Sequence, residues 1–483
     1  MGLGLLLLTL TLVARLKLTG MAVDSALRSA GASDITFNVS QASPWEVVVD
    51  DVGFQVKSQA FAAKQVVFSR AHWWTPSLGA VRVAQARMPL KVDGDNLNPS
   101  AWFFSKNGSA AIQSRGIPAE EISVDGQLVI QAAALSEQAI TLRIKARQSD
   151  KGTWIGELEI EGSGLAMKAE GAFAPASSQF DFKIPTVSLD LKIWQGFIQS
   201  LVVLPGGTLD LAGQLTGSAE GKLVGGKVTS HGVVRLRNGR VKNEVRAIAA
   251  DGIEADFEFA DFGKFLTKPG TVRVRELRAG QLAITEIEAE AAMEGPEKIV
   301  VPRASLKALG GSVAAEPFKY FTNLRELDAV LLVDGVSVAE VMALTKDLPA
   351  RASGRVDGRL PVHIDDSGLR FGTGWLELKP GVYAEVQFDA LGLLTGGIPT
   401  NHPSYAMLKK IESGLLKLKI GAMRLDIRPP NAPPGRSAQL HLQGEPVDRE
   451  VKAPISLDLN VNGPLEKLIN LGLDSRLSFG TKP

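Results

Sequence analysis

The chain of 483 residues contains no cysteine. This absence excludes disulfides, thiolate nucleophiles and cysteine-ligated zinc sites. An excess of one charge is also missing, because 53 basic and 52 acidic side chains give a formal net charge of +1. Proteins that bind nucleic acid usually carry a basic stripe. The balanced charge therefore argues against a nucleic-acid partner.

Motifs for catalysis are missing as well. The sequence has no GxxxxGK[ST] phosphate loop, no GxSxG nucleophile elbow and no HExxH zinc helix. Its five histidines are scattered, and none has a second histidine at ligand spacing. We therefore expect a protein that is not an enzyme and that binds neither a metal nor a cofactor.

Two short stretches could still be sites. His363, Asp365 and Asp366 place an imidazole beside two carboxylates, and His363 with Asp365 could chelate a metal from one face of a strand. Both residues also occupy the polar phase of an alternating pattern, and "DDSG" is ordinary hairpin chemistry. We interpret the cluster as the solvated side of a hairpin. The second stretch, "HWW" at 72–74, is a stacking platform or, more simply, packing at a sheet end.

Apolar and polar residues alternate with period two along most of the chain. In "VDGRLPVHID" the polar phase holds Asp357, Arg359 and His363. Such alternation predicts strands with one apolar and one solvated face, as in antiparallel sheets. The residues that we expect to line the apolar side are Val356, Leu360, Val362, Ile364, Leu369, Phe371, Leu416, Leu418, Ile420, Leu425, Ile427, Ile455, Leu457, Leu459 and Val461.

Each predicted strand has one apolar face, and the fold must shield these faces from water. A sandwich pairs two such faces within a smaller domain, and an outer-membrane barrel would show aromatic girdles, whereas aromatic residues make up only 6% here. The fold class that we predict is mainly β: a long, twisted antiparallel sheet curled into an elongated apolar groove. About 25 strands at 4.8 Å spacing would build a groove near 120 Å long.

Helical patterns are few and short. They cover 16–30, 337–348, 401–414 and 462–472. After Gly372 and Gly374 the apolar phase moves from odd to even positions, which predicts a β-bulge that bends the sheet.

The apolar start "MGLGLLLLTLTLVA" would reach about 21 Å as a helix, short of a bilayer's roughly 30 Å core. A clipped membrane anchor, an uncleaved signal anchor and a buried helix all fit it. We expect three regions: 1–32 with the N-terminal apolar helix, a β-groove module at 33–190, and a second β-groove region at 191–483.

The second region resembles a known family. The stretches "SGRVDGRLPVHIDDSGLRFGTGWLELKPG", "PSYAMLKKIESGLLKLKIGAMRLDIRPPN" and "GEPVDREVKAPISLDLNVNGPLEKLINL" are similar to YdbH-like proteins, relatives of the AsmA and TamB proteins of the Gram-negative envelope. The resemblance covers about 205–483. Upstream, "FSRAHWWTPSLGAVRVAQARMPLKVDG" is similar to the first β unit that follows the inner-membrane anchor in such proteins.

This resemblance implies a function. It predicts a periplasmic bridge anchored in the inner membrane, which carries phospholipid along its groove to the outer membrane. Its partners would be phospholipid acyl chains, the inner membrane through the N-terminus, and an outer-membrane protein or lipoprotein. An assembly factor that presents sheet edges to outer-membrane proteins is the alternative.

Overall fold

The computed structural model gives the fold of residues 15–462. It describes this range apart from residues 26, 29–31, 57–58, 72–77, 93–118, 133–134, 150–151, 176, 178, 202–208, 225–226, 246, 325, 344–349, 366–367, 389–394, 430–435 and 448–453. The predicted apolar helix at the N-terminus, the "HWW" stretch, Asp366 and the helix at 462–472 fall outside the described residues.

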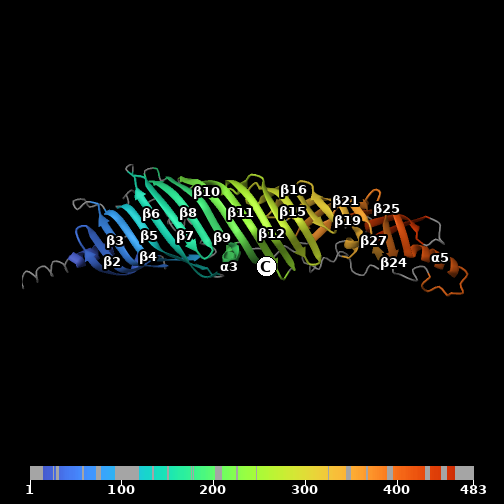
Figure 1. Cartoon of the computed structure of the whole chain (residues 1–483), viewed down its shortest axis with the longest axis horizontal. Helices are drawn as coiled ribbons and strands as arrows, with labels where there is room; N and C mark the ends of the chain where they lie inside the picture. Colours follow the sequence, from blue (N-terminus) through green and yellow to red (C-terminus); the bar gives the residue numbers. More distant parts are fainter. Residues whose placement is uncertain are drawn as a thin grey trace, which may run out of the picture. The chain divides into compact units, whose positions relative to one another are not determined.

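Strands dominate the described chain, and all 27 are assigned to one sheet (Figure 1). The strands of the first half are β1 Ser33–Ala42, β2 Glu46–Val56, β3 Gln59–Arg70, β4 Leu78–Val92, β5 Ala119–Ala132, β6 Leu135–Gln148, β7 Trp154–Gly162, β8 Leu165–Ala174, β9 Gln179–Asp190, β10 Asp210–Val224, β11 Lys227–Asn243, β12 Ile248–Asp261 and β13 Leu266–Thr267. They are followed by β14 Gly270–Ala279, β15 Leu282–Met293, β16 Lys298–Ala308, β17 Gly311–Ala315, β18 Phe318–Phe321, β19 Glu326–Ser337, β20 Ala350–Ala352, β21 Arg355–Asp365, β22 Gly368–Phe371, β23 Gly374–Leu378, β24 Ala384–Phe388, β25 Lys417–Ile427, β26 Arg436–Pro446 and β27 Ile455–Asn462. The prediction of a mainly β chain is confirmed.

The sheet is mixed rather than purely antiparallel. Successive strands pair antiparallel through most of the chain, for example β14 with β15 and β26 with β27. Strands β4 and β5 instead run parallel. A parallel pair needs a crossover connection of a dozen or more residues, and residues 93–118 separate these two strands, which is a sufficient length. The expectation of an all-antiparallel sheet is wrong at this pair.

Helices are few and short, as predicted. Residues 15–25 are helical, α4 spans Val338–Ala343, and α5 spans Tyr405–Leu416. The hydroxyl of Ser337, directly before α4, accepts a hydrogen bond from the backbone N–H of Glu340 at 3.4 Å. Among the described residues, none of the helices combines the length and the hydropathy that a membrane crossing requires.

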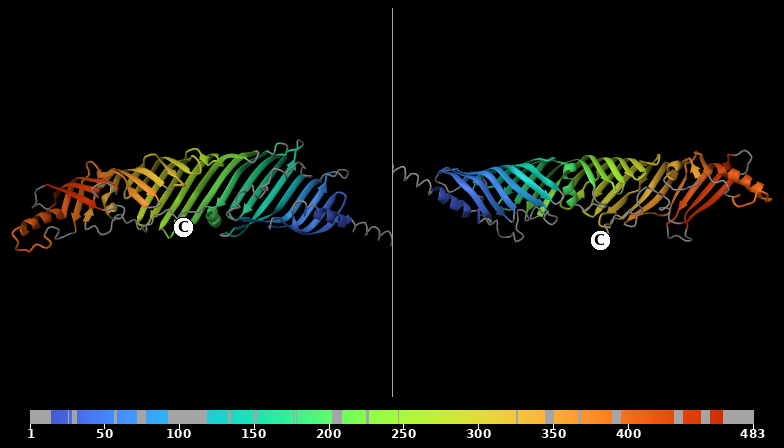
Figure 2. Two further views of the ribbon diagram at one scale, coloured as in Figure 1. Left: turned by 180° about the vertical axis from the view of Figure 1, so that it is seen from behind. Right: turned by 90° about the horizontal axis from the view of Figure 1, so that it is seen from below.

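The chain divides into two compact units. Unit 1 comprises Met1–Val203, Ala212–Arg235 and Phe259–Gly263, and unit 2 comprises Leu204–Leu211, Leu236–Glu258 and Lys264–Pro483. Within each unit, neighbouring strands lie side by side and curve along their length (Figure 2). The three regions predicted from the sequence, with boundaries at 32 and 190, stay a prediction.

Unit 1 contains one helix that the sequence patterns did not predict. Helix α3, Leu191–Leu201, directly follows β9, and its first turn is capped by Asp190, whose carboxylate accepts a hydrogen bond from the N–H of Lys192 at 2.9 Å. Trp194 is 3% exposed and packs with Ile130 and Ile140. Its indole N–H donates to the carbonyl oxygen of Ser163 at 2.9 Å. The helix therefore covers part of the apolar face of unit 1.

Loss of this anchor should destabilise unit 1. We expect Trp194→Ala to lower the free energy of unfolding by about 3–5 kcal/mol, because it removes a buried aromatic ring and leaves a cavity. Ile193→Ala is the matched control on the same helix, since Ile193 is 40% exposed, and it should change stability by less than about 0.5 kcal/mol. Urea unfolding followed by tryptophan fluorescence and circular dichroism measures both. Equal effects of the two substitutions would contradict the anchoring role of Trp194.

Candidate functional site

The apolar side chains of unit 2 form rows that cross many strands. One row runs through eight paired strands from β16 to β27 and contains, in order, Leu306, Val313, Val333, Gly358, Leu376, Leu425, Leu440 and Leu459. Seven steps of about 4.8 Å make this row about 34 Å long. We call the surface that carries this row, with the apolar residues in register beside it, the apolar face of unit 2.

The apolar face is neither bare nor fully covered. The side chains of Leu306, Val333 and Leu425 are half-buried, whereas Leu459 at the last strand is 40% exposed. The inner layer of a β-sandwich would bury such residues completely. Half-burial along a whole row fits one sheet whose apolar face curls toward itself.

The predicted lining residues fall mostly on this face. Of these residues, the ones that are buried are Val356, Val362, Phe371, Leu418, Ile420 and Ile427. The half-buried ones are Leu360, Ile364, Leu369, Leu425, Ile455 and Leu457. Two core clusters join them to neighbours: Val362, Phe371 and Ile427 in one, Leu418 and Ile420 in the other. Their burial supports a shared apolar face.

Two lining residues need separate mention. Leu416 is the last residue of α5, so its expected place on a strand is wrong; the helix continues beyond Gly414, and β25 starts at Lys417. Val461 pairs with Ala438 across β26 and β27, in register with the apolar face. The side chains of Leu416 and Val461 are outside the described part of the structure.

The opposite face of unit 2 carries charged rows. Arg424 contacts Glu377 on the neighbouring strand at 3.1 Å, and on the next strands His441 contacts Asp458 at 2.5 Å. Arg424 also lies over the Trp375 ring, with 5.4 Å from its guanidinium carbon to the ring centroid. Exposed pairs of this kind add little stability each. Their main effect is to keep this face in water, which leaves the other face for apolar contacts.

His363 and Asp365 lie on the charged face. The Nδ1 atom of His363 is 2.6 Å from a carboxylate oxygen of Asp328 on β19, and its Nε2 atom is 3.2 Å from Asp365. Arg370 pairs with the same Asp365 carboxylate. Among the described residues, no group of three or more His, Asp or Glu side chains could hold a metal ion. The cluster combines one contact within β21, between His363 and Asp365, with contacts to Asp328 on β19 and Arg370 on β22.

These pairs make stability depend on pH. The hydrogen bond to Asp328, and more weakly that to Asp365, raises the pKa of His363 above 6.5. A raised pKa in the folded chain stabilises the fold fully below pH 6.5, and this stabilisation is lost as the pH rises through the folded value. We expect the free energy of unfolding of the native chain to fall over that interval, and to fall less in His363→Gln. Urea unfolding at a series of pH values tests this; identical pH profiles for the two chains would contradict it.

Hollows on the charged side of unit 2 do not suit lipid tails. A cavity of about 650 Å³ is lined by residues that include Lys307, Asp334 and Lys379. Lys379 contacts Asp334 at 2.6 Å, and Arg355 donates hydrogen bonds to the carbonyl oxygens of Gly310 and Gly335 at 2.6 and 2.7 Å. Arg355 thus links the turn at Gly310 to strand β19, and Lys379 contacts the same strand. Charged side chains line this cavity, so it does not suit an apolar ligand.

The predicted bulge at Gly372 and Gly374 is confirmed. Phe371 pairs with Val362, and Trp375 pairs with Arg359. Four steps along one strand therefore match three along its partner, so one extra residue is present. Gly372 donates its N–H to the carbonyl oxygen of Pro361 at 2.9 Å within this break. The extra residue places Leu376 on the apolar face. Strict alternation from Phe371 would have placed Leu376 on the opposite face.

Strand irregularities of another kind lie on neighbouring strands in the first part of unit 2, and we call this line the crease. Asn238 on β11, Gly252 on β12 and Glu286 on β15 all have positive φ angles, of 51°, 65° and 49°. The register of β12 with β14 skips Gly252, and that of β14 with β15 skips Glu286. The register is the same on both sides of each skipped pair, so the two strands of each pair are interrupted at the same level without an extra residue on either one. Residues with positive φ are uncommon within strands, and here they interrupt neighbouring ladders along one line.

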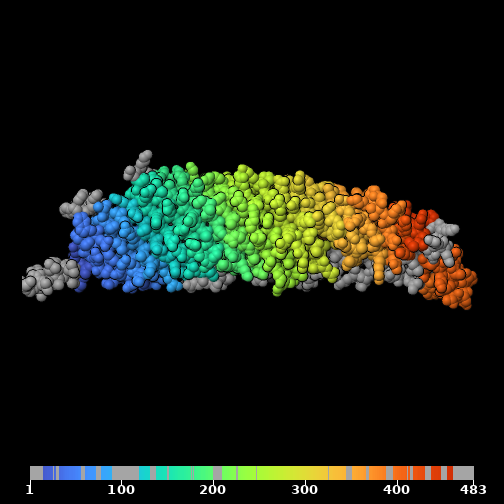
Figure 3. All heavy atoms as spheres, viewed as in Figure 1, coloured from blue at the N-terminus to red at the C-terminus, as the bar shows by residue number. Residues whose placement is uncertain are grey.

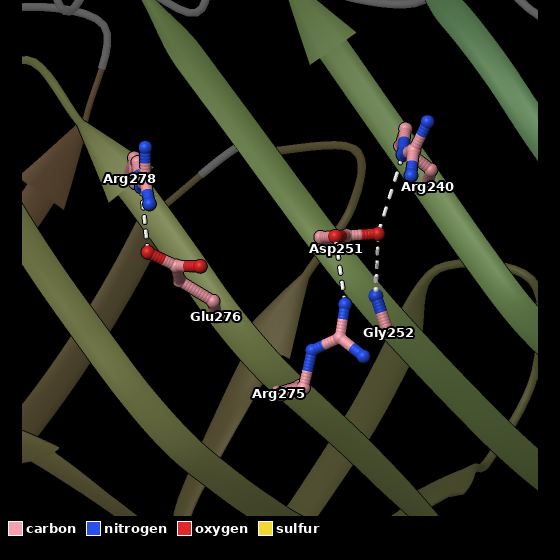
Figure 4. Close-up of polar contacts among 6 residues, drawn as sticks. All are labelled: Arg240, Asp251, Gly252, Arg275, Glu276 and Arg278. Atoms are coloured by element: carbon pink, nitrogen blue, oxygen red, sulfur yellow. Dashed lines mark hydrogen bonds and ion pairs between the residues drawn. The ribbon is translucent and has the colours of Figure 1, made fainter.

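Charged side chains hold the crease together (Figure 4). Asp251 accepts hydrogen bonds from Arg240 on β11 at 3.2 Å and from Arg275 on β14 at 2.8 Å. Its carboxylate also accepts the N–H of Gly252 at 3.1 Å. The hydrogen bond from Arg240, followed by the nearby positive charges, lowers the pKa of Asp251. One carboxylate thus ties three strands together where their ladders are interrupted.

Strands of unit 1 also contain residues with positive φ in mid-strand. Asp51 on β2 and Gln85 on β4 have φ angles of 51° and 50° in mid-strand. The registers of β2 with β3 and of β3 with β4 both skip Lys64, which lies between them. The apolar phase changes at these points: Val47 and Val49 are followed by Val52 and Phe54 on β2. Such changes of the apolar phase are visible in the sequence and could have predicted these interruptions.

Gly252 should be intolerant of a side chain. A Cβ atom built on it lies 2.7 Å from the Cβ of Arg275, and its φ is one that L-residues rarely adopt. We expect Gly252→Ala to lower the free energy of unfolding by about 1–2 kcal/mol. Gly421→Ala is the control, because a Cβ there has no atom within 4 Å. Denaturant unfolding of both variants measures the difference; equal stability would show that the crease tolerates an ordinary residue.

These observations define a class: a single-layer β-sheet protein with one charged face and one continuous apolar face, suited to hydrophobic ligands. Residues 195–382 match the family model YdbH-like, described as Intermembrane phospholipid transport protein YdbH. The predicted resemblance to YdbH-like proteins is thereby confirmed over this segment. No curated protein and no solved structure matches the chain. The description of the matching family names intermembrane phospholipid transport.

Proposed function

We propose that the chain is a bridge along which phospholipid moves between the inner and outer membranes, with the acyl chains held against the apolar face. The observation that carries this proposal is the row of apolar side chains through eight neighbouring strands of unit 2. A discrete pocket would hold one ligand in one place. A continuous row instead offers equivalent contacts at each successive strand, as transport along the sheet requires.

The energetics support a passive conduit. A phospholipid with about 30 methylene groups loses roughly 24 kcal/mol of favourable burial when its tails enter water. An apolar face that curls around the tails replaces most of the bilayer contacts, so the barrier to transfer falls. Such a face gives no direction, because lipid is bound equally well at both ends. Direction comes from the lipid gradient between the membranes or from a partner.

The membrane attachments are part of the proposal. The N-terminal sequence "MGLGLLLLTLTLVA" is apolar, and its apolar character supports a role in attachment to the inner membrane. An outer-membrane protein or lipoprotein would receive the lipid at the other end. Through these attachments the protein would contribute to lipid homeostasis of the outer membrane.

Crosslinking tests which face holds lipid. We expect a photoreactive amino acid at Leu459 to crosslink to phospholipid, because this residue is 40% exposed on the apolar face. The same amino acid at Asn460, its exposed neighbour on the charged face, is the control and should give little lipid adduct. Mass spectrometry of the purified full chain measures both adducts. Equal yields at the two positions, or purification without phospholipid, would contradict the proposal.

Substitutions test the same point in cells. Leu459→Asp should reduce the copurified phospholipid by more than half, since a carboxylate on the apolar face disfavours acyl chains. His363→Ala should leave it unchanged, because His363 lies on the charged face. Val362→Asp is a poorer test, because Val362 is only 7% exposed and a buried charge would unfold the chain. Loss of lipid in the folded His363→Ala variant would argue for a site at the histidine instead.

A further inference from the structure

We propose that helix α5 and the turn before it, residues 395–416, form a docking surface for a phospholipid bilayer that carries anionic headgroups. This inference rests on the proposed function, because it identifies a part of unit 2 at which lipid would meet a membrane. The segment lies outside residues 195–382, which match the family model. Its four supporting observations are charge, the position of one acid, exposed apolar side chains, and its place at the end of the strands.

The first part of this segment, residues 395–411, carries charge of one sign. Residues 395–411 contain Lys409 and Lys410 but no aspartate or glutamate, although the whole chain has nearly equal numbers of acids and bases. Both lysines are exposed. Adjacent lysines on a helix surface attract an anionic membrane, and each contributes near the surface independently of headgroup geometry.

The first acid after residues 395–411 is Glu412 on α5, which is buried and only 6% exposed. Its Oε2 atom accepts a hydrogen bond from the N–H of Thr395 at 2.8 Å and one from the Thr395 hydroxyl at 2.9 Å. The carboxylate is thus used to hold the turn against the helix. Because this carboxylate is buried, it is not exposed beside the two lysines.

Apolar side chains accompany the lysines. Met407 is 68% exposed and lies three residues before Lys410, so the two side chains share one side of the helix. Tyr383, just before β24, is 66% exposed, and the Nζ of Lys419 lies 4.3 Å from its ring centroid. Helix α5 packs against β24 and β25. Tyrosine and lysine together are typical of the membrane–water interface, where the ring and the aliphatic stem enter the headgroup layer.

The position of α5 within unit 2 suits docking. In Figures 1 and 3 this orange-red segment projects beyond the strands β24 and β25, so a flat surface could approach it. An acidic protein is the other occupant that the charge would allow. The single exposed methionine and tyrosine form no contiguous apolar patch of the size expected at a protein interface. The mixture of separate apolar tips and lysines favours a bilayer.

Vesicle flotation of the full chain tests the docking surface. We expect binding to vesicles of phosphatidylcholine with phosphatidylglycerol and much weaker binding to phosphatidylcholine alone, with a loss at high salt. The double variant Lys409→Glu/Lys410→Glu should bind the anionic vesicles at least about 10-fold more weakly. Its control is Lys192→Glu/Lys227→Glu, which reverses two exposed lysines of unit 1 and should leave flotation unchanged. Met407→Asp should weaken flotation, whereas Val245→Asp, at an 84% exposed site in a turn, should not.

The outcomes separate this inference from the proposed function. Copurified phospholipid in both double variants, with flotation lost only in the α5 variant, supports both proposals. Unchanged flotation of the α5 variant, or equal losses in the two double variants, overturns the docking surface and leaves the conduit intact. Binding of the α5 segment to an acidic protein but not to anionic vesicles also overturns it. Absence of copurified phospholipid from the unsubstituted chain overturns the conduit instead.

Discussion

The structure depends on one constraint: a single-layer sheet must keep its apolar side chains on one face and its charged side chains on the other. Because side chains alternate along a strand, one misplaced residue would reverse the two faces for the rest of that strand. The chain meets the constraint with matched registers, such as Leu425 opposite Leu440 and Arg424 opposite His441. Every strand in the row then adds to the same apolar surface.

Residues with positive φ reconcile this constraint with local interruptions of the ladder. Asn238, Gly252 and Glu286 have positive φ in mid-strand, and the registers of β12 with β14 and of β14 with β15 continue unchanged beyond the interruption. The apolar phase of the sequence changes at the same places, so the two faces of unit 2 stay separate. Phase and register are therefore adjusted to each other strand by strand, and the hydrogen bonds of Asp251 hold three strands together at this interruption.

The same separation places the titratable clusters on the charged face. His363 with Asp328, and His441 with Asp458, resemble catalytic pairs when read in isolation. Each lies in a row of charged residues on the solvated face, where its partners come from neighbouring strands. The chemistry of the molecule lies in the continuity of the apolar face instead, and such continuity belongs to many residues rather than to a few.

Alternation in the sequence determined the strands, their two faces, the bulge at Gly372 and most of the apolar face, because a period of two is a local property. Tertiary structure alone decided the parallel pairing of β4 with β5, since pairing partners are not encoded in a strand's own pattern. It also decided the place of α3, whose Trp194 is buried only through contacts with Ile130 and Ile140. The crease lies between these cases: each phase slip is local, but only the paired strands place the slips in one line.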